Sequence, residues 1–432
     1  MAADVQRGNE AVVALSRLAI FACCYIENGY VPIAPFLVSR AEVGILLSAQ
    51  YFASLLVLVP TGLAIDSCGP LPILHRMLLV SVAGVVLGAI FPSFWCQLLS
   101  RAMLGGAFSG FFNACMALIM ERFNEPLRSR YLGSALGLGT IGNMVGPPAI
   151  GAVYDLAASA GLEQPRFWAL AHPLILLALA WRMLKAVPMC KGSEPTEPLL
   201  QDAHIEAKLV AQPSALFARA LGVYVSVGLR AWILALELAC LFGSASAAIT
   251  ASAIEMHRRE FSPTAIGLTA VPAGLMQSLF SQWSGRFASS AKNREAVLLA
   301  CPVVLGVMAI CIAAIGSLHF SMLVPIVLIL MTCSAVEGAA DPTSMSMMAD
   351  LARGASLGYG QAVTASEMAV SSGLAMGPCL AHLMRHREFS SLCLVIGLLA
   401  LLVSVACARF LRNIPHNDSE ADEAVQANET PH

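Results

Sequence analysis

The charged residues of this chain are gathered in short segments that separate long apolar stretches. Only 12% of the 432 residues are charged and 58% are apolar, whereas soluble domains carry about a quarter charged residues. Within a bilayer every backbone N–H and C=O group must find a partner inside the protein, so apolar stretches of this kind must be helical. The sequence therefore predicts an all-α membrane protein. The net charge of −2 says nothing about nucleic acid, but the lack of a basic tract predicts no nucleic-acid partner.

A helix needs about 20 mostly apolar residues to cross the hydrocarbon core. Twelve stretches of the sequence meet this requirement, although almost nothing separates the third from the fourth. In chain order they are Arg17–Ser39, Val43–Ile65, Leu71–Phe94, Trp95–Met120, Tyr131–Asp155, Phe167–Val187, Ala231–Ile254, Pro263–Phe287, Glu295–Ser317, Phe320–Asp350, Leu357–Leu383 and Phe389–Leu411.

One long polar connection divides these stretches into six and six. Its charged, Pro- and Ser-containing composition is typical of a solvated linker. We therefore expect an N-terminal six-helix bundle over 1–187, a linker over 188–230, a C-terminal six-helix bundle over 231–412 and a tail over 413–432.

The placement of Lys and Arg predicts the orientation, because cytoplasmic loops of membrane proteins carry an excess of basic residues. Most of the 25 Lys and Arg residues fall in segments that share one side if both termini are cytosolic. We expect a multi-pass protein with both termini and the linker in the cytosol, in the plasma membrane or in a vesicle or vacuole membrane.

The two halves echo each other. Gly142-Asn-Met-Val-Gly146-Pro147 in the fifth stretch has a counterpart in Gly373-Leu-Ala-Met-Gly377-Pro378 in the eleventh. Internal repeats of this kind place the substrate site near the middle of the bilayer, where the halves meet. The glycines also permit close packing of helices, which alternating access requires.

Several motifs resemble those of the major facilitator superfamily. Gly62, Asp66 and Gly69 resemble its loop signature after the second helix, with Ser67 where the family usually carries a basic residue. Arg101-Ala-Met-Leu-Gly105 resembles the fourth-helix signature, with Leu104 in place of the common Gln. The stretch from Gly142 to Gly151 resembles the fifth-helix antiporter signature. The resemblance implies the major facilitator fold, in which two six-helix bundles are related by a pseudo-two-fold axis.

Other residues resemble one branch of that superfamily, the drug:proton antiporters and vesicular amine transporters. Glu27-Asn28 with Val31-Pro32, and the stretch from Glu337 to Pro378, follow the order of the amine transporters. The acid that those transporters carry deep in the seventh helix has no counterpart in Gly243–Thr250.

Acidic residues outnumber basic ones inside the predicted spans. A charge at the bilayer centre costs roughly 2.5–3.5 kcal/mol on insertion scales, so it normally faces a cavity or a partner. Against the single base Arg101 stand the acids Glu27, Glu237, Glu337, Asp341 and Glu367. The sequence therefore predicts an acidic cavity that favours cations and protons over anions.

Glu27 and Asn28 are candidates for substrate binding, in a helix that Pro32 and Pro35 would loosen. A helix-packing acid, hydrogen-bonded to a neighbouring span, is the alternative for Glu27. Glu337 and Asp341 are four residues apart and share a helical face. They are further candidates for substrate binding, and two like charges in a low dielectric favour proton uptake by one of them. Asp341 could instead lie at a solvated helix break beside Pro342.

Glu367 resembles a family acid that pairs with a lysine on the second helix, and the corresponding position here is Gln50. The resemblance implies that Glu27, Glu337 and Glu367 take part in proton coupling, with Arg101 as a coupling element or an anchor of the fourth helix. For Glu237 we expect an interfacial ion pair with Arg230 instead.

These residues together predict a secondary active transporter that exchanges protons for small organic cations by alternating access. The alternatives are a facilitator or symporter of neutral or anionic metabolites and, from another class, a non-transporting membrane sensor or scaffold. No nucleophile–base set or metal-ligand set is apparent, so we expect no enzyme, no cofactor and no metal. We expect a monomer in the bilayer whose partners are a small-molecule substrate and protons.

Overall fold

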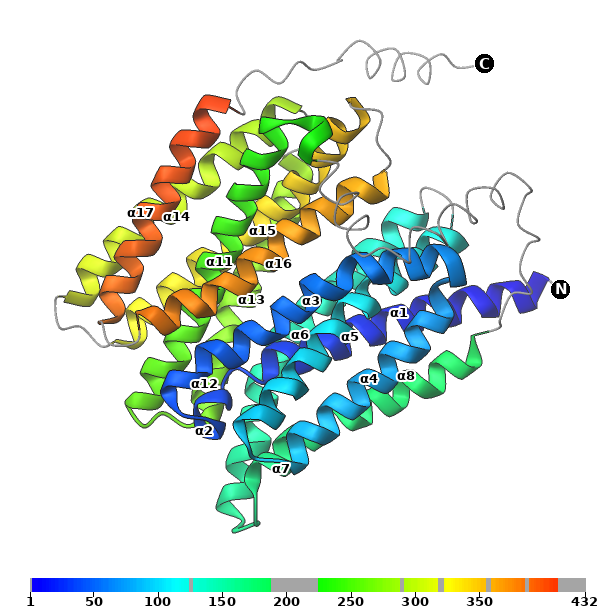
Figure 1. Cartoon of the computed structure of the whole chain (residues 1–432), viewed down its shortest axis with the longest axis horizontal. Helices are drawn as coiled ribbons and strands as arrows, with labels where there is room; N and C mark the ends of the chain where they lie inside the picture. The colour runs from blue at the N-terminus through cyan, green and yellow to red at the C-terminus, as the bar shows by residue number, and fades with distance from the viewer. Residues whose placement is uncertain are drawn as a thin grey trace.

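The computed structural model describes residues 2–123, 127–187, 224–287, 291–317, 322–354, 359–384 and 388–410. Most of the predicted linker and the whole predicted tail lie outside these ranges, so the boundaries of the two halves stay a prediction. The described residues are helical and contain no strand (Figure 1).

The helices of the first half occupy 2–186. They are α1 (Ala2–Gly29), α2 (Ala34–Leu37), α3 (Arg40–Cys68), α4 (Pro70–Ile90), α5 (Phe94–Arg122), α6 (Leu127–Ser159), α7 (Pro165–Ala171) and α8 (Leu174–Ala186). Those of the second half are α11 (Leu229–Arg258), α12 (Pro263–Leu268), α13 (Ala270–Phe287), α14 (Ala291–Ser317), α15 (Leu323–Gly354), α16 (Tyr359–Leu383) and α17 (Phe389–Phe410).

Each predicted span coincides with one helix or with a broken pair. The first span is broken because α1 ends at Gly29, and the short α2 follows after a turn. The third and fourth spans are separate helices: α4 ends at Ile90, and the hydroxyl of Ser93 caps α5 by accepting a hydrogen bond from the Cys96 N–H at 3.4 Å.

Nine candidate membrane spans are found among the described residues by length and composition. The predicted fifth, eighth and eleventh spans (α6, the α12–α13 pair and α16) are not among them. All three contact the opposite half: α6 packs on α12 and α13, and α16 packs on α3. Their glycine and polar residues lower the mean hydropathy and permit close helix packing.

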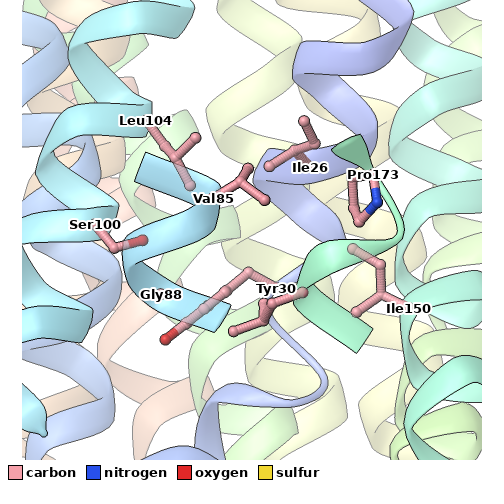
Figure 2. Close-up of a pocket in the computed structure, with 9 residues that line it drawn as sticks. Ile26, Tyr30, Val85, Gly88, Ser100, Leu104, Ile150 and Pro173 are labelled. Carbon is pink, nitrogen blue, oxygen red and sulfur yellow. The ribbon is translucent and has the colours of Figure 1, made fainter. Parts of the chain in front are cut away.

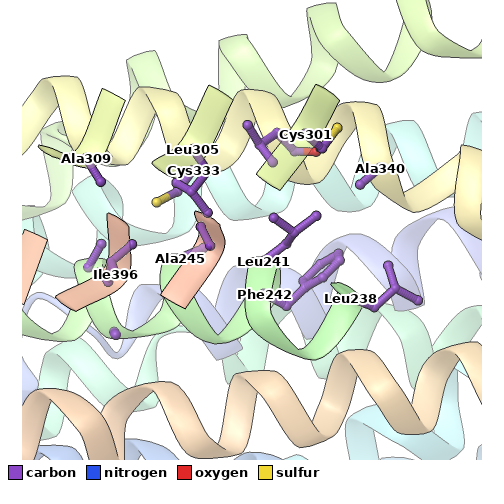
Figure 3. Close-up of a cluster of buried hydrophobic side chains, with 14 of the residues drawn as sticks. Leu238, Leu241, Phe242, Ala245, Cys301, Leu305, Ala309, Cys333, Ala340 and Ile396 are labelled. Atoms are coloured by element: carbon purple, nitrogen blue, oxygen red, sulfur yellow. The ribbon is translucent and has the colours of Figure 1, made fainter. Parts of the chain in front are cut away.

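The buried side chains fall mainly into two large clusters. One contains only residues of the first half, from Val12 to Val187, and the other only residues of the second half, from Tyr224 to Ala400. Figure 3 shows part of the second cluster, with Leu241 of α11, Leu305 of α14 and Ile396 of α17. Each half thus has a hydrophobic core of its own.

The echoed glycines make equivalent contacts within the two halves. A Cβ on Gly146 of α6 would lie 2.4 Å from the carbonyl oxygen of Tyr25 in α1. A Cβ on Gly377 of α16 would lie 2.4 Å from the carbonyl oxygen of Gly243 in α11. Gly142 likewise lies against α1, at the carbonyl of Phe21. Only glycine permits these backbone approaches.

The prolines that follow these glycines contact the opposite half. The carbonyl of Pro147 lies against Gly267 of α12, and the carbonyl of Pro378 lies against Gly44 of α3. Both contacts lie toward the end of the molecule where α2 and α12 are found, away from the chain termini (Figure 1). The pairing of α6 with α12 and of α16 with α3 therefore follows the sequence repeat.

Gly69 ends α3 with φ 78°, a conformation that favours glycine, and α4 begins at the next residue. Gly62 has open space where a Cβ would lie. The side chain of Asp66 is outside the part of the chain that the structure describes. The equivalent end of the second half carries an ion pair, in which Arg294 Nη1 lies 2.9 Å from Asp350 Oδ2.

Candidate functional site

Glu27 lies in the last turn of α1 and is only 8% exposed. The side chains of Gln50 and Tyr51, both on α3, are hydrogen-bonding neighbours of its carboxylate, and Arg101 of α5 lies within electrostatic range. Pro32 follows the end of the helix and does not loosen it at Glu27. The predicted acid is therefore buried among polar side chains of two neighbouring helices.

Arg101 is the largest fully buried side chain among the described residues. Its Nη2 donates to the backbone carbonyl of Glu27 at 3.1 Å, and its guanidinium lies over the ring of Tyr30, 4.2 Å from the centroid. Nε and Nη1 have no hydrogen-bond partner among the described residues. Arg101 thus ties α5 to the end of α1, but it forms no ion pair with the Glu27 carboxylate.

Hydrogen bonds hold the ring of Tyr30 in place beneath Arg101. Its hydroxyl donates to Gln97 Oε1 at 2.8 Å, and Gln97 Nε2 donates to the carbonyls of Gly88 and Phe91, both at 2.7 Å. The ring of Tyr30 is thereby fixed under the guanidinium. Tyr30, Gln97 and Tyr51 were not predicted as site residues, although a Tyr or Gln inside an apolar span is itself a signal of a buried polar partner.

A cavity inside the first half also borders Tyr30 (Figure 2). Most of its lining is apolar, including Ile26, Val85, Leu104 and Ile150, with Ser100 and the Tyr30 side chain as the polar exceptions. The Ser100 hydroxyl already donates to the carbonyl of Gly84 at 2.7 Å. No acid lines this cavity, so it is not the predicted cation site.

Three of the four candidate acids of the second half lie close together. Glu337 and Asp341 are on α15, Glu367 is on α16, and Asp341 is within electrostatic range of both glutamates. Glu337 is 7% exposed. No Lys or Arg among the described residues forms an ion pair with any of them. The structure therefore brings together Glu337, Asp341 and Glu367, the acids for which the sequence suggested substrate binding or proton coupling in this half, and leaves Glu237 apart from them.

The helix break proposed beside Asp341 is wrong. Pro342 lies inside the continuous helix α15. Proline has no N–H, so it cannot donate to the carbonyl of Gly338 one turn earlier. The hydroxyl of Ser284 on α13 lies 3.4 Å from that carbonyl and 3.2 Å from the carbonyl of Ser281, so it shares one hydrogen between the two. The helix continues through Pro342 with a polar group of a neighbouring helix beside the freed carbonyl.

Tyr51 links the acids of the two halves. It is a hydrogen-bonding neighbour of Glu27, and it also lies within electrostatic range of Glu337. Gln50, which stands where the resembling family has a lysine paired with the acid at the position of Glu367, is likewise a hydrogen-bonding neighbour of Glu27. The absence of a Gln50–Glu367 ion pair agrees with the sequence, because glutamine carries no charge.

Asn28 has a partner of its own. Its Nδ2 donates to Oδ1 of Asn143 on α6 at 2.7 Å. This bond connects α1 and α6 one residue after Gly142, where the two helices are in close contact. Asn28 and Asn143 are both partly exposed.

Glu237 does not form the expected interfacial pair with Arg230. Its side chain has no exposed surface, and Oε2 accepts a hydrogen bond from the Cys407 thiol at 3.4 Å. Oε1 has no partner among the described residues. Hydropathy did not predict the burial of Glu237, because a residue two turns into a helix can be buried or interfacial, depending on how the helix is rotated.

Replacing Glu237 by Leu is expected to raise the thermal unfolding temperature of the detergent-solubilised protein. Exchanging a buried, incompletely bonded polar group for an apolar one of similar size is often neutral or stabilising, by about 1–4 kcal/mol for buried charges. Glu237→Ala should lower that temperature instead, because it leaves a cavity. A lower temperature for Glu237→Leu than for Glu237→Ala would contradict this account.

One acid near the end of α11 was also missed. Glu255 pairs with Arg259 (Oε1 to Nε, 2.8 Å) and with Arg258 (Oε2 to Nη1, 3.5 Å). Among the described residues no group of three His, Cys, Asp or Glu side chains is arranged to hold a metal ion.

Comparison with protein families finds a match to the Major Facilitator Superfamily over residues 18–378. No curated protein matches the chain. The family match covers most of both halves, and the apolar helices with their two separate cores agree with it. The chain therefore belongs to the major facilitator superfamily and is a multi-pass membrane transporter of a small molecule.

Proposed function

We propose that this transporter exchanges protons for small organic cations by alternating access. The observation that supports this most strongly is the position of Tyr51, near both Glu27 of the first half and Glu337 of the second. A carboxyl group contributed by each half, within electrostatic range of one shared side chain, agrees with a substrate site at the interface of the two repeats.

The charge balance of this region favours cations. Glu27, Glu337, Asp341 and Glu367 are acids, and Arg101 is directed to a backbone carbonyl and an aromatic ring. An ionised carboxylate held out of water without a partner is unfavourable. Each such group therefore favours either a proton or a cationic substrate. Competition between the two for the same carboxylates couples their movements in opposite directions.

The contacts between the halves support alternating access. They include Pro147 with Gly267 and Pro378 with Gly44, at the end away from the termini. With both termini in the cytosol, this closed end would face the extracellular space or a vesicle lumen. The acids would then exchange ligands with the cytosol in this conformation and with the other side after the halves rock.

The other two hypotheses fit the described residues less well. A carrier of anionic metabolites would need unpaired basic side chains, and in the part of the chain that the structure describes Arg101 is the one base within electrostatic range of Glu27 and Tyr51. A non-transporting sensor would not need complementary contacts between the halves that follow a repeat. We infer that the protein acts as a monomer, because each chain would supply both halves of the site.

The proposal can be tested with purified protein in liposomes that have an acidic interior. We expect a quaternary ammonium or N-methylpyridinium cation, which cannot cross the bilayer as a neutral base, to accumulate several-fold above protein-free liposomes. A protonophore should abolish the accumulation. Gradient-independent equilibration of a sugar or carboxylate would favour the facilitator, and binding without flux would favour the sensor.

A further inference from the structure

The carboxylate of Asp155 connects the two halves of the transporter. Asp155 lies in the last two turns of α6, and Thr264 is the second residue of α12. Asp155 Oδ2 accepts a hydrogen bond from the Thr264 backbone N–H at 3.0 Å and another from its hydroxyl at 2.5 Å. One side chain of the first half thus accepts two bonds from one residue of the second half.

The backbones around this contact are pressed together. A Cβ on Gly151, one turn before Asp155, would lie 2.5 Å from the carbonyl oxygen of Pro263. Close approach of the two helices brings the carboxylate to Thr264. Asp155 and Arg166 both lie within electrostatic range of Tyr154, and Arg166 forms no ion pair with Asp155 among the described residues. Thr264 is therefore the hydrogen-bonding partner of this carboxylate among the described residues.

A weaker contact joins the halves between α3 and α16. The Ser48 hydroxyl and the Cys379 thiol lie 3.2 Å apart, next to the approach of Gly44 to Pro378. Of these two contacts between the halves, only the one with Asp155 involves a charged group. Hydrogen bonds to ionised groups are roughly twice as strong as neutral ones.

We propose that Asp155 and Thr264 form a latch that holds the halves together at the end away from the termini, and that its release controls opening there. Opening at this end separates α6 from α12, so both hydrogen bonds must break. The latch acts on the conformational equilibrium and touches no substrate, which makes Asp155 and Thr264 positioning residues. The inference rests on the transporter fold and not on proton coupling.

Thr264→Val tests the latch, because it removes the hydroxyl but keeps the side-chain shape and the backbone N–H. The matched control is Ser262→Ala, which removes a hydroxyl cap from the same helix (Ser262 Oγ to the Ala265 N–H, 3.3 Å) without any contact between the halves. Backbone deuterium exchange is followed at 40–48 and 376–384, the other contact between the halves at this end. Local fraying of α12 does not reach these segments.

We expect Thr264→Val, without substrate, to speed exchange in both distant segments by about tenfold, the effect of losing one hydrogen bond to a charged group. Ser262→Ala should leave them unchanged. Asp155→Asn should act as Thr264→Val does, and the double variant should add little to either. Unchanged exchange at 40–48 and 376–384 in Thr264→Val, with a monodisperse protein, would overturn the latch. Because no pH gradient is applied, a failure of proton coupling would not produce that result.

Discussion

Glu27→Gln is expected to lower gradient-driven cation uptake by about tenfold or more. The amide has nearly the same shape and still accepts hydrogen bonds from Gln50 and Tyr51, so the fold should persist. It neither takes up a proton at physiological pH nor carries a negative charge. A charge-assisted contact contributes about 1.5–3 kcal/mol, which is the origin of the expected loss. Initial rates in liposomes, at saturating and subsaturating cation, measure it.

Glu237→Gln is the matched control for this experiment. It makes the same chemical change at a fully buried acid of the second half, whose described partner is Cys407. Uptake by Glu237→Gln should equal that of the unaltered protein. Glu27→Asp keeps the charge with a shorter side chain and should retain part of the uptake. If Glu27→Gln transports as well as Glu237→Gln, Glu27 is a packing residue and the proposed exchange loses its acid in the first half.

Hydropathy predicts the helices because crossing a bilayer imposes a length and an apolar composition on every span. It places the ends of α1 and the break between α4 and α5 less well, since these depend on single residues such as Gly29 and Ser93. The echo of Gly142–Pro147 in Gly373–Pro378 was visible from the sequence. The structure adds that each stretch contacts its own half through glycine and the opposite half through proline.

The partners of the acids could not be predicted. They depend on how each helix is rotated and on which helices are neighbours, and a pattern within one span contains neither. Glu237 was therefore expected at an interface, and the position of Gln50 beside Glu27 was not predicted. Asp155 lies at the end of a predicted span, where an acid normally faces water. Its bonds to Thr264 arise from the approach of two halves that are distant in sequence.

Gly146→Ala is expected to destabilise the transporter and impair transport, whereas Gly137→Ala in the same helix should not. The added methyl group at 146 would lie 2.4 Å from the carbonyl oxygen and 2.9 Å from the Cα of Tyr25. Both are backbone atoms, so α1 and α6 must move apart. At Gly137 the added group meets nothing within 4 Å. The two variants make the same residue change in the same helix, so the gain in helix propensity is the same. They differ only in the atoms that the added methyl group contacts.

The expected change in stability of each variant is the balance of two opposing free-energy contributions. Ala favours a helix over Gly by about 1 kcal/mol, and overpacking costs about 1–3 kcal/mol, or more where backbone must shift. Gly137→Ala should therefore melt at or slightly above the temperature of the unaltered protein, and Gly146→Ala several degrees below it. Thermal unfolding in detergent measures both.

Transport should fall with Gly146→Ala even at temperatures where the protein stays folded. Tyr25 is two residues before Glu27, and the carbonyl of Glu27 accepts the hydrogen bond from Arg101. Moving α1 away from α6 shifts Glu27 relative to Gln50 and Tyr51, whose helix α3 packs on α5. If Gly146→Ala melts and transports like Gly137→Ala, the approach of α1 to α6 is looser than described. The position of Glu27 would then not depend on this glycine.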